Sequence, residues 1–186
     1  MKSISKIYTI IFFGLLIFIS CNKKMEINNG GEELITTLIY TLVPLDGGDS
    51  VVLSFQDTDG EGGNEPVIIT ETLSPNVLYS GTISLLNESM EPAENIGLEV
   101  AAENEEHQMF YQTDGVDLTI EYADIDANGN PLGLSTMLNT GDAGIGNLTI
   151  TLRHEPEKTA NGVADGDITN ADGETDIEVT FQITIQ

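Results

Sequence analysis

The chain has 186 residues, with 31 acidic and six basic side chains and a formal net charge of −25. Such an excess of acids repels nucleic acids and anionic lipid headgroups, so we expect no nucleic-acid partner. Apolar residues make up 40% of the chain, which indicates a folded domain rather than an acidic disordered tail. A single cysteine excludes a disulfide framework.

The first twenty residues have the order of a secretory signal peptide of the bacterial lipoprotein type. Lys2 and Lys6 form a basic start, and the run from Ile7 to Ile19 is almost wholly apolar. This run is shorter than the ~20 residues of a membrane-spanning helix. A small residue, Ser20, then precedes the only cysteine, Cys21. We expect cleavage before Cys21 and lipidation of its thiol, which would anchor the protein to a membrane.

The position three before the cysteine is Phe18, where such signals most often have Leu. The alternative is an ordinary signal or an N-terminal membrane anchor with an incidental Cys21. Removing residues 1–20 takes two of the six bases and none of the 31 acids, which leaves a formal charge of −27. Residues 21–33 are polar and predict a flexible tether. We expect the protein in the cell envelope, at the outer membrane, on its periplasmic face or at the surface.

Residues 34–186 predict a single domain built from short strands. Segments rich in β-branched and aromatic residues alternate with turns of Gly, Pro, Asn and Asp. In chain order, strands are expected over 34–43, 50–56, 67–72, 77–86, 108–112, 116–123, 134–140, 146–154 and 177–185. The last is the clearest, because apolar and polar residues alternate along it with a period of two. A stretch rich in Glu and Ala, 88–107, predicts one short helix.

This pattern of elements predicts a mainly β fold. Strands do not alternate with helices, so parallel βαβ units are not expected. The best match is an antiparallel β-sandwich with immunoglobulin-like character.

The chain resembles a group of small, poorly characterised lipoproteins from Bacteroidota. The resemblance rests on the segments Leu34–Leu38, Glu105–Gln108, Tyr122–Pro131, Leu152–Pro156, Asp167–Asn170 and Glu174–Glu178. Members of this group are sometimes labelled as type 1 periplasmic-binding folds, which have two α/β lobes. The resemblance implies the envelope location and, for a chain of this length and strand content, a single β domain. It implies no activity.

Two histidines could bind a transition metal. His107 follows Glu103 by four residues and Glu99 by eight, so a helix would place the three side chains on one face. His154 lies at the end of a predicted strand. If the fold brings His107 and His154 together with Glu103, they form a ligand set suited to zinc, copper or nickel. The alternative is that each histidine lies at the rim and pairs with a neighbouring glutamate.

Acidic loops between strands could bind calcium. The candidate ligands are Asp57, Asp59 and Glu61 in one loop, and Asp124, Asp126 and Asn128 in another. A third acidic loop covers residues 165–174. Alternating Asp and Asn around a turning Gly can supply the oxygens that calcium needs. No loop matches the full EF-hand pattern. The alternative is that these are ordinary turns, which use the same residue types.

No enzyme motif is recognisable. The G-x-S-x-G elbow, the P-loop and the dinucleotide glycine pattern are all missing. The chain has no tryptophan and 6% aromatic residues, which disfavours a sugar-stacking platform. We therefore expect a non-catalytic, membrane-anchored binding module, with a divalent cation such as zinc or calcium as ligand and an outer-membrane uptake protein as partner. The alternative is a structural or adhesion-type module without a small-molecule ligand.

Overall fold

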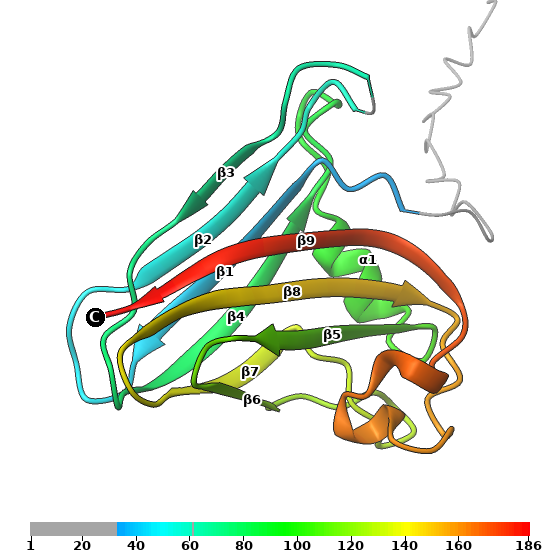
Figure 1. Cartoon of the computed structure of the whole chain (residues 1–186). Helices are drawn as coiled ribbons and strands as arrows, with labels where there is room; N and C mark the ends of the chain where they lie inside the picture. The colour runs from blue at the N-terminus through cyan, green and yellow to red at the C-terminus, as the bar shows by residue number, and fades with distance from the viewer. Residues whose placement is uncertain (1–32, 61) are drawn as a thin grey trace, which may run out of the picture. The chain divides into compact units, whose positions relative to one another are not determined.

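The computed structural model describes residues 33–60 and 62–186 (Figure 1). The predicted signal peptide, Cys21, the tether as far as residue 32, and Glu61 lie outside the described residues. The described residues form one compact unit. Within the described part of the chain, every helix is too short or too polar to cross a membrane.

Two antiparallel sheets form the domain (Figure 1). The larger sheet has the order β3-β2-β1-β4-β7-β6, with β1 (Thr37–Pro44), β2 (Val51–Gln56), β3 (Val67–Thr70), β4 (Leu78–Leu86), β6 (Leu118–Tyr122) and β7 (Ser135–Thr140). The smaller sheet has the order β5-β8-β9, with β5 (His107–Asp114), β8 (Gly144–His154) and β9 (Glu174–Ile185). The predicted antiparallel β-sandwich is confirmed, and all nine expected strands are present.

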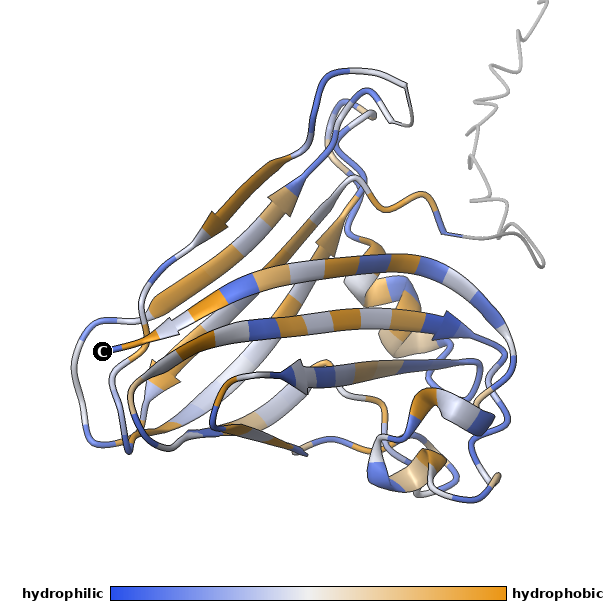
Figure 2. Ribbon diagram, in the orientation of Figure 1, coloured by the Kyte–Doolittle hydropathy of each residue, from blue (hydrophilic) through white to orange (hydrophobic). Residues whose placement is uncertain are grey.

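The core lies between the two sheets because apolar residues alternate along the strands. Figure 2 shows this alternation along β8 and β9. The inward side chains of β9 are Ile177, Val179, Phe181, Ile183 and Ile185, all at most 8% exposed. They pack into one cluster with residues of β1 and β8 such as Leu38 and Leu148. Burial of apolar area at about 25 cal/mol per Å² is the main force that holds the sheets together.

The helix is shorter than the sequence predicts. Helix α1 covers Ile96–Ala102, and the predicted extension to His107 is wrong because His107 is the first residue of β5. Asn95 begins the helix by accepting a hydrogen bond from the Leu98 N–H at 3.2 Å. Only Ile96 and Val100 of the helix are buried, so the apolar face is one turn long. The helix packs against β4.

A long connection between β8 and β9 covers the outer side of β5. It contains two 3₁₀ turns, η1 (Val163–Asp165) and η2 (Ile168–Asn170). Phe110 of β5 points away from the main core and forms a second small cluster with Val163 and Ala171. The smaller sheet is therefore covered on both faces at β5.

Candidate metal centre

The strand register brings the two histidines together. His107 begins β5 and His154 ends β8, and the two residues are directly opposite each other in the antiparallel pair. Side chains of such a pair point to the same face of the sheet. Their imidazole rings stack, with centroids 4.8 Å apart and planes inclined by 10°. His107 is fully buried and His154 is 8% exposed.

A β-bulge adds a carboxylate to this pair. Leu152 is paired with Ile177 but Arg153 with Thr175, so Asp176 is the extra residue in β9. A bulge re-aims side chains relative to the regular alternation. The Asp176 side chain is buried, and its Oδ2 lies 3.8 Å from His107 Nε2. Sequence reasoning missed Asp176, because strict alternation places it on the outer face beside Glu178.

The orientation of His107 leaves one ring nitrogen available as a ligand. Nδ1 lies 3.2 Å from the Glu103 carbonyl oxygen, and it can donate a hydrogen bond there in the Nδ1–H tautomer. In this tautomer Nε2 carries the lone pair. Nε2 is buried and has no hydrogen-bond partner among the described residues, because 3.8 Å from Asp176 is too long for one.

Burial favours the neutral form of His107. Burial is the largest cause that lowers the pKa of His107, and the positive charge that His154 can carry lowers it further. The bond to the Glu103 carbonyl opposes these effects. A neutral imidazole with a fixed tautomer is the form that binds metals.

Glutamates surround the histidines on the side of α1 and the N-terminal segment. The Glu33 N–H donates to Asp176 Oδ1 at 3.4 Å, and ligand atoms of Glu33, Glu103 and His107 all lie within 4.8 Å of one another. Burial raises the pKa of Glu33, and the charges of Glu103 and Asp176 raise it further. Burial and the charge of Glu33 likewise raise the pKa of Glu99. Like charges are thus crowded here, and a bound cation would relieve their repulsion.

Glu103 lies close to His107, but not because the two residues share a helical face with Glu99, as the sequence predicts. Glu103 follows the end of α1 and His107 lies in β5, so the turn between them brings the two residues together. On the other side of the pair, Glu106 Oε2 lies 4.0 Å from His154 Nε2.

The arrangement contains a two-nitrogen, one-oxygen ligand set. The ligand atoms of His107, His154 and Asp176 all lie within 4.8 Å of one another, and imidazole with carboxylate suits zinc, copper or nickel. Metal–nitrogen bonds of 2.0–2.1 Å would require the two ring nitrogens at about 3.3 Å, with intersecting ring planes. The stacked rings must therefore rotate apart on binding. His154 is the more exposed of the two rings, at 8% against 0% for His107.

The first predicted calcium loop uses its carboxylates to hold its own turn. Asp57 Oδ1 accepts a hydrogen bond from the Gly60 N–H at 2.8 Å, and Asp59 Oδ2 accepts one from the Asn64 N–H at 3.1 Å. The bonds from Asn64 are the largest causes that lower the pKa of Asp59. Glu61 lies outside the described residues.

The second predicted calcium loop is organised by protein groups in the same way. Asp124 accepts hydrogen bonds from the Gly133 and Ser135 N–H groups at 2.7 and 3.0 Å. Asp126 Oδ1 accepts one from the Asn128 N–H at 2.8 Å. Asp126 Oδ2 lies 2.9 Å from the ammonium of the buried Lys158. A protein cation therefore already neutralises this carboxylate.

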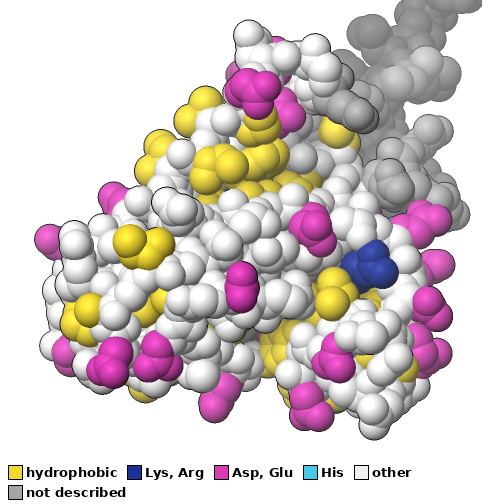
Figure 3. Space-filling model, in the orientation of Figure 1, with side chains coloured by type: hydrophobic (Ala, Val, Ile, Leu, Met, Phe, Trp, Pro, Cys, Tyr) yellow, Lys and Arg dark blue, Asp and Glu magenta, His cyan; other side chains and the backbone are white. Residues whose placement is uncertain are grey.

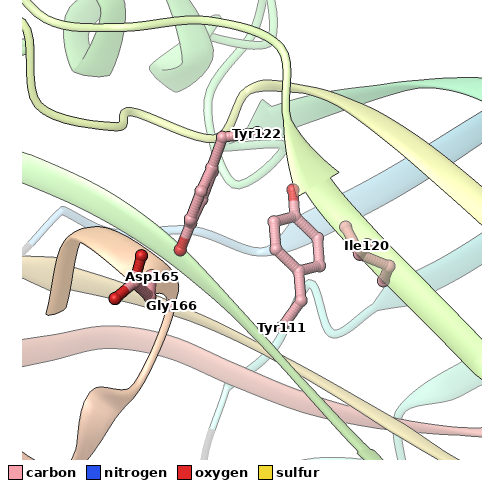
Figure 4. A pocket seen from close by; sticks show the side chains of 5 residues that line it. All are labelled: Tyr111, Ile120, Tyr122, Asp165 and Gly166. Atoms are coloured by element: carbon pink, nitrogen blue, oxygen red, sulfur yellow. The ribbon is translucent and has the colours of Figure 1, made fainter. Parts of the chain in front are cut away.

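The third acidic loop adjoins a small cavity. The cavity has a volume of about 40 Å³ and is lined by Tyr111, Ile120, Tyr122, Asp165 and Gly166 (Figure 4). The Tyr111 hydroxyl donates to the Gly133 carbonyl at 2.6 Å and the Tyr122 hydroxyl donates to the Met109 carbonyl at 2.8 Å. This space suits one or two waters rather than a substrate.

No protein-family model matches the chain, and the comparisons with curated proteins and with solved structures find no similar protein.

Proposed function

We propose that this chain is an envelope lipoprotein whose β-sandwich domain binds a divalent transition-metal ion, zinc, copper or nickel, at His107, His154 and Asp176. The observation that carries the proposal is the buried His107 Nε2, which is oriented by the Nδ1 bond to Glu103 and has no hydrogen-bond partner among the described residues. A buried polar nitrogen of this kind costs free energy unless a ligand satisfies it.

The surrounding charges support a cation rather than an anion. Glu33 and Glu103 lie beside His107. Burial is the largest cause that raises the pKa values of Glu33 and Glu99, and the charges of neighbouring carboxylates raise them further. A divalent ion would offset this repulsion and favour the ionised carboxylates. The ligands come from the start of β5, the end of β8 and the bulge in β9, so neighbouring strands of one sheet hold all three.

Metal binding is tested with the full chain purified in detergent. Equilibrium dialysis against zinc and copper is expected to show one ion per chain, held at micromolar free metal or below. The copper-loaded protein should show nitrogen hyperfine structure in its electron paramagnetic resonance spectrum, from two imidazole ligands. Absence of binding below millimolar free metal would overturn the proposal.

Conservative variants locate the site. His154→Gln and Asp176→Asn each remove one ligand at similar volume, and each should weaken zinc binding at least about tenfold. The matched control is the double variant Asp57→Asn and Asp59→Asn, which removes two carboxylate charges from an acidic loop and should leave the affinity unchanged. Equal loss in the control and in the site variants would show that net charge, and not this site, attracts the metal.

The anchor has a test of its own. Replacing Cys21 with Ser should abolish incorporation of labelled palmitate and move the protein from the membrane fraction to the soluble fraction. Unchanged fractionation of the Cys21→Ser protein would contradict lipidation. It would not bear on the proposal that the domain binds a metal.

A further inference from the structure

Strand β3 is an exposed apolar edge of the larger sheet. It is the outermost strand beside β2, and Val67, Ile68 and Ile69 are 57%, 49% and 53% exposed. The smaller sheet approaches β3 through the end of β9, and Leu73, three residues after β3, forms a bridge to Ile185. Figure 3 shows apolar side chains gathered over this part of the molecule. Proteins protect such an edge by keeping the strand very short, by placing Lys or Pro inside it, or with a bulge. β3 is short, at four residues, but Val67–Thr70 contain no Lys or Pro.

The hydrogen-bond pattern shows which backbone groups face the open side. The Glu71 N–H donates to the Val52 carbonyl, and the register pairs Ile69 with Ser54. Hydrogen-bonded and non-bonded pairs alternate in an antiparallel ladder. The backbone N–H and C=O groups of Ile68 and Thr70 therefore point away from β2, and no described residue pairs with that side of β3. These groups can accept one more strand.

The inner face of β3 continues an apolar groove. Ile68 is paired with Phe55 in the register, so both side chains lie on the same face. Phe55 lines a groove of about 380 Å³ together with Leu34, Ile35 and Ile177, and Asp57 and Asp59 lie at its acidic margin. An added strand would place its inward side chains against Ile68 at the border of this groove.

Charge decides against a second copy of this chain as the added strand. Glu65 and Glu71 flank β3, and antiparallel self-pairing about Ile68 would place Glu65 of one copy opposite Glu71 of the other. Like charges directly opposite each other destabilise a strand pair. Residues 33–186 also contain only two bases, Arg153 and Lys158.

Both bases are already engaged. Lys158 is buried against Asp126, and Arg153 donates to the Asp172 carbonyl at 3.1 Å and to the Thr175 hydroxyl. The domain therefore offers no cation to balance a second acidic copy, whereas a basic partner would be attracted.

The geometry points to β3 as the docking edge for an extended segment of another protein. That segment has apolar residues at alternate positions and a Lys or Arg at each end, next to Glu65 and Glu71. It pairs with the outward N–H and C=O groups of Ile68 and Thr70 as a seventh strand of the larger sheet. Backbone pairing supplies affinity, while the alternating apolar side chains and the terminal charges supply specificity.

The probe is a fluorescein-labelled peptide, Lys-Val-Thr-Val-Thr-Val-Lys, titrated into the full chain in detergent at low salt and followed by fluorescence anisotropy. Its twin with Glu at both ends should bind at least about tenfold more weakly. In a Glu65→Lys variant this preference should shrink or reverse. Equal binding of the two peptides, or no binding of either, would overturn the proposal.

A backbone variant separates edge pairing from adhesion to apolar surface. Thr70→Pro removes an N–H that faces the open side, at an edge position where proline is tolerated, and it should weaken binding of the Lys-ended peptide at least about tenfold. Thr70→Val keeps the N–H and is the matched control, with binding unchanged. Equal effects of both substitutions would overturn strand addition. The chain without peptide is also analysed by sedimentation. If it forms a dimer, and Thr70→Pro dissociates that dimer, the edge binds a second copy of the chain, and the proposal of a different partner protein is overturned.

Discussion

At the scale of single residues, Lys158 takes the place that a bound cation would have in an acidic loop. Its ammonium donates to Asp126 Oδ2 at 2.9 Å and to the carbonyl of Asn104 at 2.6 Å. Burial opposes ionisation of Asp126, but the hydrogen bond from Lys158 and the bonds from Asn130 and Asn128 leave its pKa lowered. Lys158 thus joins the loop after α1 to the loop after β6 and to the connection before β9.

We predict that Lys158→Met destabilises the domain by about 3 kcal/mol, because Asp126 keeps its buried charge and loses its partner. The measurement is chemical denaturation followed by circular dichroism. The control is Glu105→Gln, an exposed substitution near the same loop, which should change the unfolding free energy by less than about 0.5 kcal/mol. A Lys158→Met protein as stable as the parent would show that the pair is not needed for stability.

At the scale of elements, Gly81 permits the close packing of β1, β4 and β7. It lies in β4, opposite Leu42 of β1 and Thr136 of β7. A Cβ at this position would lie 2.6 Å from a ring carbon of Tyr40. The Tyr40 hydroxyl shares a buried hydrogen bond with the Thr136 hydroxyl at 2.7 Å. Burial raises the pKa of Tyr40 far above its ordinary value, so the hydroxyl stays protonated.

We predict that Gly81→Ala costs about 1–3 kcal/mol of stability through overpacking, since the buried Tyr40 ring cannot move away freely. Thermal unfolding of the variant tests this. Gly144→Ala in β8 is the matched control, because nothing lies within 4 Å of its added Cβ, and its stability should stay close to that of the parent. The prediction is wrong if both variants unfold at the same temperature.

The strands could be predicted from the sequence because period-two alternation is a local signal. Ile177, Val179 and Phe181 alternate with polar residues in the sequence and point into the core in the structure. The length of the helix could not be predicted in this way, because the Glu-rich composition of residues 88–107 extends well beyond the single turn that has a buried face. Local composition therefore predicted the type of this element but not its length.

The site could be predicted only in part. His107 and His154 stand out in the sequence because histidines are few, and the structure stacks their rings. Glu103 groups with His107 and Glu33, while Asp176 is the carboxylate that groups with both histidines. Asp176 gives no such signal, because a bulge of one residue depends on how β8 and β9 pair and not on the residues of β9 alone. The carboxylates of Asp57, Asp59, Asp124 and Asp126 also serve their own turns through hydrogen bonds that composition does not reveal.

At the scale of the whole molecule, charge opposes compactness. Residues 33–186 carry 29 of the 31 acids and two of the six bases, and their mutual repulsion favours expanded states. Salt shortens the range of this repulsion, from about 30 Å at 0.01 M to about 10 Å at 0.1 M.

We predict that raising NaCl from low salt to about 0.5 M increases the melting temperature by about 3–6 °C, equivalent to about 1–2 kcal/mol. Differential scanning calorimetry measures it. KCl at equal concentration should give the same rise, since the effect depends on ionic strength. A melting temperature that is constant or falls with salt would contradict self-repulsion as a limit on stability.

The position of β9 in the chain has a consequence for synthesis. Its five inward side chains complete the core, and the Gln186 N–H and the Thr184 carbonyl bond to Leu73, more than a hundred residues earlier. A nascent polypeptide therefore cannot close its interior while residues 174–186 are still inside the ribosome.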